Sequence, residues 1–256
     1  MPLPPEDPPD TPMSPPRPIS PDESGTSRPV LLAVAAEVEL RAIVDGLGVR
    51  ALAGAERWRA NPLCPGVEVV LTGIGKANAA GGVAGALDRG HHGGVISLGI
   101  GGSLPGGAEI GSLVLGERSV FADEGIETET GFQSCLEMGF PIMPGESDVI
   151  EACPSWVEAW AGQVDLVAPI ATVSTCSGTD ERARRVGERT GAAVEAMEGA
   201  GVGLAAHTIA PGLPFAELRV VSNTTGNRAS QRWELERALS ELGRVLGRLS
   251  LARSPD

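Results

Sequence analysis

The chain has 256 residues, of which 42% are hydrophobic and 21% charged, and its formal net charge is −13. This length and composition are typical of a globular protein with one sizeable core. Binding to a phosphate backbone needs a basic surface, and Lys and Arg form no cluster in this sequence, which argues against a nucleic-acid partner. No apolar run is long enough to span a bilayer and no N-terminal segment resembles a signal peptide, so we expect no membrane partner and a cytoplasmic location.

The four cysteines show neither C-x-x-C spacing nor a histidine at metal-ligand spacing. A disulfide framework or a zinc site would need such a pattern. We therefore expect no metal site and predict four buried thiols, at Cys64, Cys135, Cys153 and Cys176.

Residues 1–29 hold 11 of the 21 prolines, with Ser, Asp and Glu between them and few apolar side chains. Such a composition buries too little apolar surface to order itself. The sequence predicts a disordered Pro-rich tail over 1–29 and a single domain over 30–256.

From Val30 onward, apolar runs of strand length alternate with helical segments. Continuous apolar strands are typical of a sheet that is covered on both faces, so the alternation predicts an α/β fold with three αβα layers around a twisted mixed, largely parallel central sheet. The predicted strands are 30–36, 67–72, 95–99, 112–122, 166–173, 192–196 and 215–222. The predicted helices are 37–47, 77–90, 180–189, 198–210 and 231–249, and a long loop over 126–147 is predicted to fold over a site.

Several predicted strands end in glycine-rich or polar stretches. In open α/β sheets the carboxyl ends of the strands gather at one edge, where ligands bind, so we expect Glu39, Gly101, Glu198 and Asn223 to converge. Simpler roles stay open at this point, because Glu is favoured in the first turn of any helix, Asn caps helices and turns, and glycines form tight turns. Neither glycine-rich turn completes G-x-G-x-x-G and no Walker A motif is present, so we expect no organic cofactor.

Five stretches along the chain resemble, in their order, the ligand-binding strand ends of the nucleoside phosphorylase and nucleosidase superfamily. They are Ala35-Ala36-Glu37-Val38-Glu39, Gly73-Ile74-Gly75-Lys76, Gly99-Ile100-Gly101-Gly102-Ser103, Glu195-Ala196-Met197-Glu198-Gly199 and Arg219-Val220-Val221-Ser222-Asn223. Within the superfamily, Asn223, Asp123-Glu124-Gly125 and Gln231-Arg232-Trp233 most resemble the futalosine hydrolase family. The resemblance covers about residues 30–250 and rests on the ordered set of motifs.

The resemblance implies roles for two carboxylates. Glu39 is expected to be the general base that deprotonates an attacking water, and Met197 with Glu198 is expected to hold the ribose. A carboxylate can accept hydrogen bonds from both hydroxyls of a ribose 2′,3′-diol, and its charge stabilises the oxocarbenium-like transition state of glycosidic cleavage. The predicted site residues are Glu39 and Asn223 as catalytic groups, with Gly101, Gly102, Cys176, Met197, Glu198 and Ser222 as substrate-binding groups.

Asn223 is where the sequence departs from the methylthioadenosine nucleosidases, which carry an aspartic acid at this position. An amide has a donor and an acceptor side by side, so Asn223 can accept from N7–H of a purine while it donates to a 6-oxo group. A carboxylate would repel that oxygen. The residue therefore predicts hypoxanthine, and not adenine, as the leaving base.

The phosphorylases of the superfamily hold phosphate with an Arg in an R-x-G-T pattern, and Ser97-Leu98-Gly99-Ile100 stands in its place. Loss of that guanidinium removes the main phosphate contact, which favours water as the nucleophile. Arg57, Arg59 and Arg118 are possible replacements and keep a phosphorylase open as an alternative.

The resemblance implies an N-glycosyl hydrolase that releases hypoxanthine from futalosine, giving dehypoxanthine futalosine in menaquinone biosynthesis. It also implies a small-molecule nucleoside partner, no metal or cofactor, and a homodimer or a larger homo-oligomer; the loop at 126–147 is the predicted contact for the aromatic carboxylate end of the substrate. The alternatives are a methylthioadenosine/S-adenosylhomocysteine nucleosidase, a purine nucleoside phosphorylase, or a catalytically silent nucleoside-binding protein. We expect no catalytic role for the three histidines, and packing or surface roles for Trp233 and the arginines around it.

Overall fold

The computed structural model describes residues 28–49, 55–143 and 147–251. Nearly all of the tail predicted at 1–29 lies outside the described residues, so the tail and the division into domains stay predictions. Within the described ranges, no helix is both long and apolar enough to cross a membrane.

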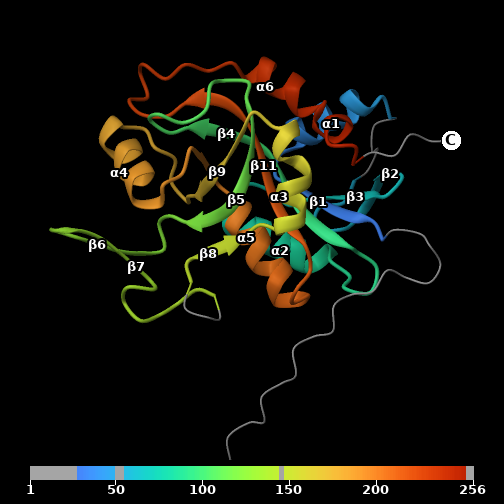
Figure 1. Ribbon diagram of the computed structural model, residues 1–256, viewed down its shortest axis with the longest axis horizontal. Helices are drawn as coiled ribbons and strands as arrows, with labels where there is room; N and C mark the ends of the chain where they lie inside the picture. Colours follow the sequence, from blue (N-terminus) through green and yellow to red (C-terminus); the bar gives the residue numbers. More distant parts are fainter. Residues whose placement is uncertain (1–27, 50–54, 144–146, 252–256) are drawn as a thin grey trace, which may run out of the picture.

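The described strands build a mixed sheet in the order β10-β9-β5-β11-β4-β1-β3-β2, with β8 paired to β5. Figure 1 labels all of these strands except β10. Parallel pairs join β1 to β3 and β4, β4 to β11, and β9 to β5 and β10, whereas β2–β3, β5–β11, β5–β8 and β4–β10 are antiparallel. Because β10 pairs with both β9 and β4, one end of the sheet closes into a ring. The strands are β1 (Val30–Val34), β2 (Asn61–Cys64), β3 (Val67–Leu71), β4 (Gly94–Ser103), β5 (Leu113–Phe121), β8 (Val149–Glu151), β9 (Leu166–Thr172), β10 (Val194–Ala196) and β11 (Phe215–Thr224).

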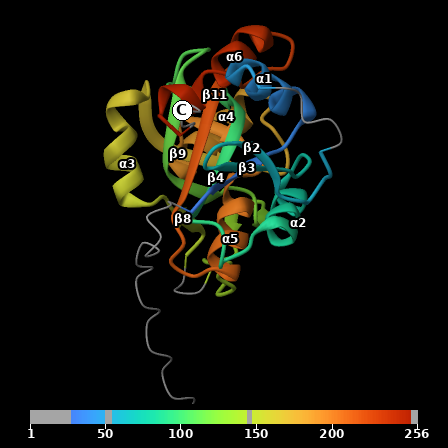
Figure 2. The same cartoon turned by 90° about the vertical axis from the view of Figure 1, so that its right-hand side faces the viewer.

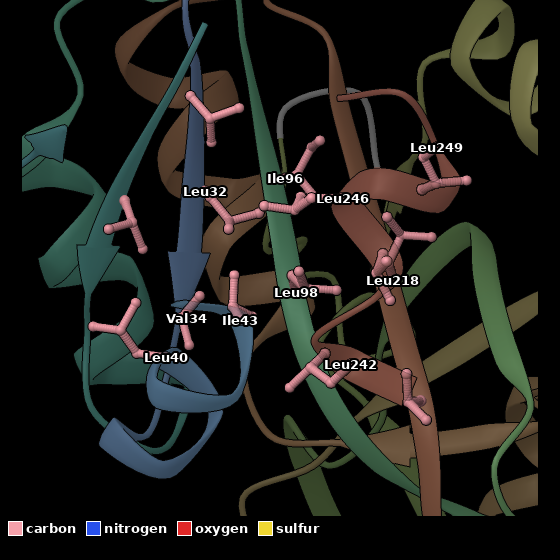
Figure 3. Packing of buried hydrophobic residues seen from close by; sticks show 14 of the residues in the cluster. Leu32, Val34, Leu40, Ile43, Ile96, Leu98, Leu218, Leu242, Leu246 and Leu249 are labelled. Atoms are coloured by element: carbon pink, nitrogen blue, oxygen red, sulfur yellow. The ribbon is translucent and has the colours of Figure 1, made fainter. Parts of the chain in front are cut away.

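Helices cover both faces of this sheet, which confirms the three-layer prediction (Figure 2). On one face, α1, α6 and α7 pack through Leu40, Ile43, Leu242 and Leu246 onto β1, β4 and β11 (Figure 3). On the other face lie α2 and α5, which approach so closely that a Cβ on Gly201 would be 2.8 Å from the Lys76 carbonyl oxygen. The helices are α1 (Glu37–Leu47), α2 (Lys76–Ala86), α3 (Pro154–Trp160), α4 (Asp180–Thr190), α5 (Gly199–Ile209), α6 (Leu235–Leu242) and α7 (Val245–Arg248).

The predicted helix over 231–249 is wrong at its start and in its middle. The chain at 231–234 is extended because Thr224 N–H donates to the Arg232 carbonyl at 3.0 Å and Glu234 N–H donates to the Ser222 carbonyl at 2.9 Å. Pairing with the end of β11 therefore outweighs helix propensity until Leu235, and the helical segment is divided into α6 and α7. This correction matters for function, since the extended segment reaches the cavity described below.

Two further predictions need correction. The predicted loop at 126–147 contains a hairpin of β6 (Gly125–Thr128) and β7 (Gly131–Ser134), which are too short for a periodic signal. The cysteines were predicted to be buried, yet Cys176 is exposed and Cys64, Cys135 and Cys153 are only half-buried; all four are free thiols. These cysteines occupy strand ends and connecting segments, where a small apolar side chain is not enclosed.

Candidate active site

The eight predicted site residues line one cavity of about 530 Å³. It lies at the carboxyl ends of β1, β4, β10 and β11, the edge at which α/β sheets bind their ligands. Segments separated by more than 180 residues thus meet in one place. The eight are Glu39, Gly101, Gly102, Cys176, Met197, Glu198, Ser222 and Asn223.

Glu39 is buried, with 5% of its surface exposed, whereas Glu37 two residues before it is exposed. One Glu39 oxygen accepts the Ile100 N–H at 2.9 Å and the other accepts the Ala36 N–H at 2.9 Å, which also caps the start of α1. Each oxygen keeps a further lone pair, so the carboxylate can still accept a proton. A solvated first-turn glutamate therefore describes Glu37 but not Glu39.

The electrostatic environment of Glu39 suits a general base. Burial raises the pKa of Glu39, while the Ile100 N–H and the positive charge of Arg219 oppose that shift. A raised pKa makes the carboxylate a stronger proton acceptor, provided that the pH keeps it ionised.

Glu198 stands at the start of α5 and is also buried. Its Oε1 accepts the Gly75 N–H at 3.0 Å, and its Oε2 lies 3.3 Å from Nη1 of Arg219. Gly75 adopts a φ of +92°, a conformation that other residues rarely take, and this turn brings its N–H to the carboxylate. Contacts from two distant elements thus fix the orientation of the Glu198 side chain.

Arg219 lies outside the described cavity wall but contacts Glu198, and the sequence analysis assigned it no role. It is 1% exposed on β11, and it donates from Nε to Oε1 of Glu217 and from Nη2 to Oγ of Ser97, each at 2.9 Å. The resemblance places Ser97 where the phosphorylases are expected to carry their phosphate-binding Arg, and in this structure the Ser97 hydroxyl accepts from Arg219. The signal in the sequence is a pair of opposite charges two residues apart within an otherwise apolar strand.

The close approach of these groups requires a glycine. A Cβ on Gly99 would lie 2.6 Å from both Nη1 of Arg219 and Oε1 of Glu39. We use the name charged floor for Glu39 and Glu198, which line the cavity, together with the buried Glu217 and Arg219, which lie outside its described wall. Burial raises the pKa of Glu217, the charge of Arg219 opposes the shift, and the Ser119 hydroxyl also donates to the Glu217 carboxylate.

An irregularity in the pairing of β11 with β4 sets the orientation of Asn223. Val221 pairs with Gly101 and Asn223 with Gly102, so Ser222 is an extra residue in β11, as in a β-bulge. The Asn223 Oδ1 accepts from Ser222 Oγ at 2.8 Å and its Nδ2 donates to the Thr224 carbonyl at 2.9 Å. The amide keeps one N–H and one oxygen lone pair for a ligand.

The segment that carries Cys176 and Ser177 is held from two sides. Glu195 pairs with Gly102 on the opposite side of β4 from Asn223, and its buried carboxylate accepts from Ser177 N–H at 2.7 Å and Ser177 Oγ at 2.6 Å. Asp123 accepts from Ser174 N–H at 2.8 Å and forms an ion pair with Lys76. The Asp123 stretch therefore anchors this segment from outside the cavity.

The outer rim of the cavity includes Arg228, Gln231 and Trp233, which we call the mouth. Trp233 is 50% exposed and donates from Nε1 to the Gln231 side-chain oxygen at 3.1 Å. The extended segment before α6 places Trp233 on the cavity wall, so its expected role in packing or at the surface stays a prediction.

The alternative phosphate-binding arginines lie elsewhere. Of the residues that the structure describes, the cavity wall contains none of Arg57, Arg59 and Arg118, and Arg57 donates to the Thr72 carbonyl at 3.1 Å. In the described part of the chain, Arg219 lies closest to the charged carboxylates of the cavity, and its nitrogens already contact Glu217, Ser97 and Glu198.

The histidines lie outside the described cavity wall, and two of them share the carboxylate of Glu68. His91, His92 and Glu68 are close enough to suggest a metal site, since their ligand atoms lie within 4.8 Å of one another. Nδ1 of His92, however, accepts the Asp88 N–H at 3.0 Å, so the neutral ring carries its proton on Nε2 and donates it to Glu68. A metal-bound histidine has the reverse arrangement, with its second nitrogen as donor, and the geometry therefore indicates a hydrogen-bonded cluster.

Comparison with known proteins matches residues 65–250 to the family model for the phosphorylase superfamily. The chain is 37% identical to futalosine hydrolase of Streptomyces coelicolor, with 72% of this chain and 79% of that protein covered. It is 36% identical to futalosine hydrolase of Thermus thermophilus, with 70% and 78% covered. The chain therefore belongs to the phosphorylase superfamily.

Within that superfamily, it belongs to the futalosine hydrolase family. Solved structures support the fold: a 5′-methylthioadenosine/S-adenosylhomocysteine nucleosidase of Neisseria meningitidis superposes with a TM-score of 0.69 at 18% identity, over 88% of this chain and 99% of that one. The native futalosine hydrolase of Helicobacter pylori superposes with a TM-score of 0.66 at 19% identity, over 89% and 99%.

Proposed function

We propose that this protein hydrolyses the N-glycosidic bond of futalosine, releasing hypoxanthine and dehypoxanthine futalosine in menaquinone biosynthesis. The observation that carries the proposal is that Glu39, Glu198 and Asn223 share one cavity in a chain of the futalosine hydrolase family. A catalytic base, a diol-binding carboxylate and a base-reading amide are the groups that this reaction needs.

In this proposal Glu39 takes a proton from a water molecule whose oxygen bonds to the anomeric carbon. The bond from that carbon to the purine nitrogen breaks, the bonding electrons go to the base, and the base takes up one proton from solvent at N7, so that it leaves as neutral hypoxanthine. Glu198 accepts hydrogen bonds from the ribose diol and places negative charge beside the developing cation. The contacts of Glu198 with Gly75 and Arg219 keep the carboxylate oriented before the substrate arrives.

Asn223 supports hypoxanthine as the leaving group. Its remaining N–H can donate to the 6-oxo oxygen, and its oxygen can accept from N7–H. Water is favoured over phosphate as the nucleophile because Arg228 is the one basic residue of the described cavity wall, and the buried Arg219 outside that wall already contacts Glu217, Ser97 and Glu198. A methylthioadenosine/S-adenosylhomocysteine nucleosidase is the less favoured alternative.

The test is to incubate the purified protein with futalosine and with methylthioadenosine, each with and without phosphate, and to measure the released base. We expect hypoxanthine from futalosine at the same rate in both buffers, and the same rate after dialysis against EDTA. Adenine release from methylthioadenosine alone would favour the alternative nucleosidase, and a requirement for phosphate would indicate a phosphorylase. Ligand binding without base release would indicate a silent nucleoside-binding protein.

A homo-oligomer and a cytoplasmic location are also part of the proposal. The native mass, measured by light scattering, tests the first, and fractionation of cells that express the protein tests the second.

A further inference from the structure

Arg228 lies on the cavity wall in the segment between β11 and α6. Its backbone N–H donates to the Gly178 carbonyl at 3.0 Å, and its Nη1 donates to the Gln231 side-chain oxygen at 2.8 Å. The guanidinium carbon lies 5.0 Å from the centre of the Trp233 ring. A backbone contact, a side-chain contact and an aromatic face thus hold the cation at the mouth.

The charge of Arg228 has no counter-ion among the residues that the structure describes. Two nearby arginines do have one: Arg232 lies 3.0 Å from a Glu234 oxygen, and Arg237 lies 3.0 Å from the other. The buried Arg219 contacts two carboxylates. Among the described residues, other arginines also lack an ion pair, but Arg228 is the one basic residue of the described cavity wall, so its guanidinium is free to pair with an anionic group of a ligand.

Futalosine carries two groups that are complementary to Arg228 and Trp233 at the mouth of the cavity. The end of the molecule remote from the purine is an aromatic ring with a carboxylate. A guanidinium binds a carboxylate through two parallel hydrogen bonds, and a half-exposed indole offers a face for an aromatic ring. By contrast, the described part of the loop at 126–147 contributes no residue to the cavity wall, so the predicted contact of that loop with the aromatic carboxylate gains no support.

We propose that Arg228 binds the carboxylate of the substrate's aromatic end, with Trp233 packing against the ring, and so selects an anionic nucleoside over one without the tail. This inference rests on the proposed function. It assigns Arg228 a role in binding and selectivity, whereas the charged floor performs the chemistry.

A competing role for Arg228 is contact with the 6-oxo group of the purine, because its backbone is joined to Gly178, next to Ser177. The two roles predict different effects of an Arg228 substitution on the binding of a nucleoside that lacks the aromatic carboxylate. Inosine has the same base and ribose as futalosine but no aromatic carboxylate. An arginine that reads the purine affects both ligands, and an arginine that binds the tail affects futalosine alone.

The experiment compares the wild-type protein with Arg228→Gln, Arg228→Lys and the control Arg232→Gln. Arg232 is a suitable control because its side chain is 72% exposed and lies outside the described cavity wall. For each protein we would measure KM and kcat for futalosine, KM for its methyl ester, and the competitive inhibition constant of inosine. Thermal melting shows whether each variant is folded.

We expect Arg228→Gln to raise KM for futalosine about 10- to 100-fold, which is the loss of a hydrogen bond to a charged group, with kcat changed less than about twofold. The KM of Arg228→Lys for futalosine should lie between those of the wild type and Arg228→Gln, because an ammonium keeps the charge but not the paired donors. The methyl ester should bind the wild-type protein as poorly as futalosine binds Arg228→Gln. Inosine inhibition and the Arg232→Gln control should stay within about twofold of wild type.

An equal loss of futalosine and inosine binding would overturn the inference and assign Arg228 to the base. Unchanged KM for futalosine in Arg228→Gln, or equal KM for the acid and the ester, would also overturn it. If the wild-type protein releases no hypoxanthine from futalosine, the proposed function fails. In that case the binding of futalosine and of its methyl ester can still be measured by displacement of a bound nucleoside. Tighter binding of the acid than of the ester in the wild type, but not in Arg228→Gln, would show that Arg228 selects a carboxylate.

Discussion

The charged floor and the mouth of the cavity are built on opposite principles. The floor joins Glu39, Glu198, Glu217 and Arg219 from three separate elements, and each of these side chains is at least nine-tenths buried. The mouth takes Arg228, Gln231 and Trp233 from one short segment, where Arg228 and Trp233 are exposed. In the proposed function, the buried charges act on the sugar and the exposed groups select the substrate. Substitutions in the floor should therefore affect turnover and stability, and those in the mouth should affect selectivity.

The largest effect is expected for Glu39→Gln. Loss of a general base reduces the rate about 10²- to 10⁴-fold, and glutamine cannot accept the proton from water. Single-turnover assays should show that loss, while calorimetry with futalosine still detects binding. Glu37→Gln is the matched control, since Glu37 is in the same helical turn but exposed. Turnover within twofold of wild type in Glu39→Gln would remove Glu39 as the base.

The next largest effect is expected for Arg219→Met. Removal of this guanidinium leaves Glu217 and Glu198 buried without their counter-ion, which costs about 3–5 kcal/mol in the free energy of unfolding. Urea denaturation measures the change, with Arg228→Gln as the comparison from the mouth, where less than about 0.5 kcal/mol is expected. Equal losses at the two positions would mean that the distinction between floor and mouth has no energetic basis.

Asn223→Asp tests whether the amide of Asn223 distinguishes a 6-oxopurine from a 6-aminopurine. A carboxylate facing the 6-oxo oxygen should lower kcat/KM for a 6-oxopurine nucleoside relative to its 6-amino counterpart by about 10², because a buried polar group is left unpaired. Hydrolysis of matched inosine-type and adenosine-type substrates provides the ratio. Glu195→Gln is a useful companion, since its carboxylate holds Ser177 rather than the amide. An unchanged ratio in Asn223→Asp would show that the amide does not read the base.

The floor and the mouth also differ in how far the sequence alone could predict them. The strand ends that carry Glu39, Glu198 and Asn223 are predictable, because buried parallel strands must place their carboxyl ends at one edge. Arg219 was missed because a charged residue within an apolar strand is assigned no partner by periodicity, and its partners Ser97 and Glu198 are far away in the sequence.

The geometry of the mouth was harder to predict, because it depends on backbone hydrogen bonds to the end of β11 and not on local helix propensity. Residues 231–234 belong to a segment with a helical pattern, and only the hydrogen bonds to Ser222 and Thr224 make it extended. That tertiary pairing moves Trp233 from an expected helix surface to the cavity wall. For the same reason, the closed ring of strands around β10 could not be deduced, because each of its antiparallel pairs joins residues that are distant in the chain.

The smallest effect expected is a difference in how salt and pH act on the two regions. Glu39 must be ionised to accept a proton, and burial raises its pKa above the ordinary value of 4.5, so kcat/KM should decline with falling pH at a higher pH than for an exposed glutamate. Protonation of Glu39 removes the general base, so kcat/KM should rise as the pH rises through the pKa of Glu39.

Raising the ionic strength from about 0.1 to about 1 M shortens the Debye length from about 10 to about 3 Å, which screens exposed charges far more than buried ones. The acid limb of kcat/KM should therefore stay in place, because the charged floor is shielded from solvent, while KM for futalosine should rise several-fold through weaker attraction at the exposed Arg228. Initial rates over a pH series at the two salt concentrations, with Arg228→Gln as the variant whose KM should lose its salt dependence, measure both. An acid limb that moves with salt would mean that the base is open to solvent and is a different group from Glu39.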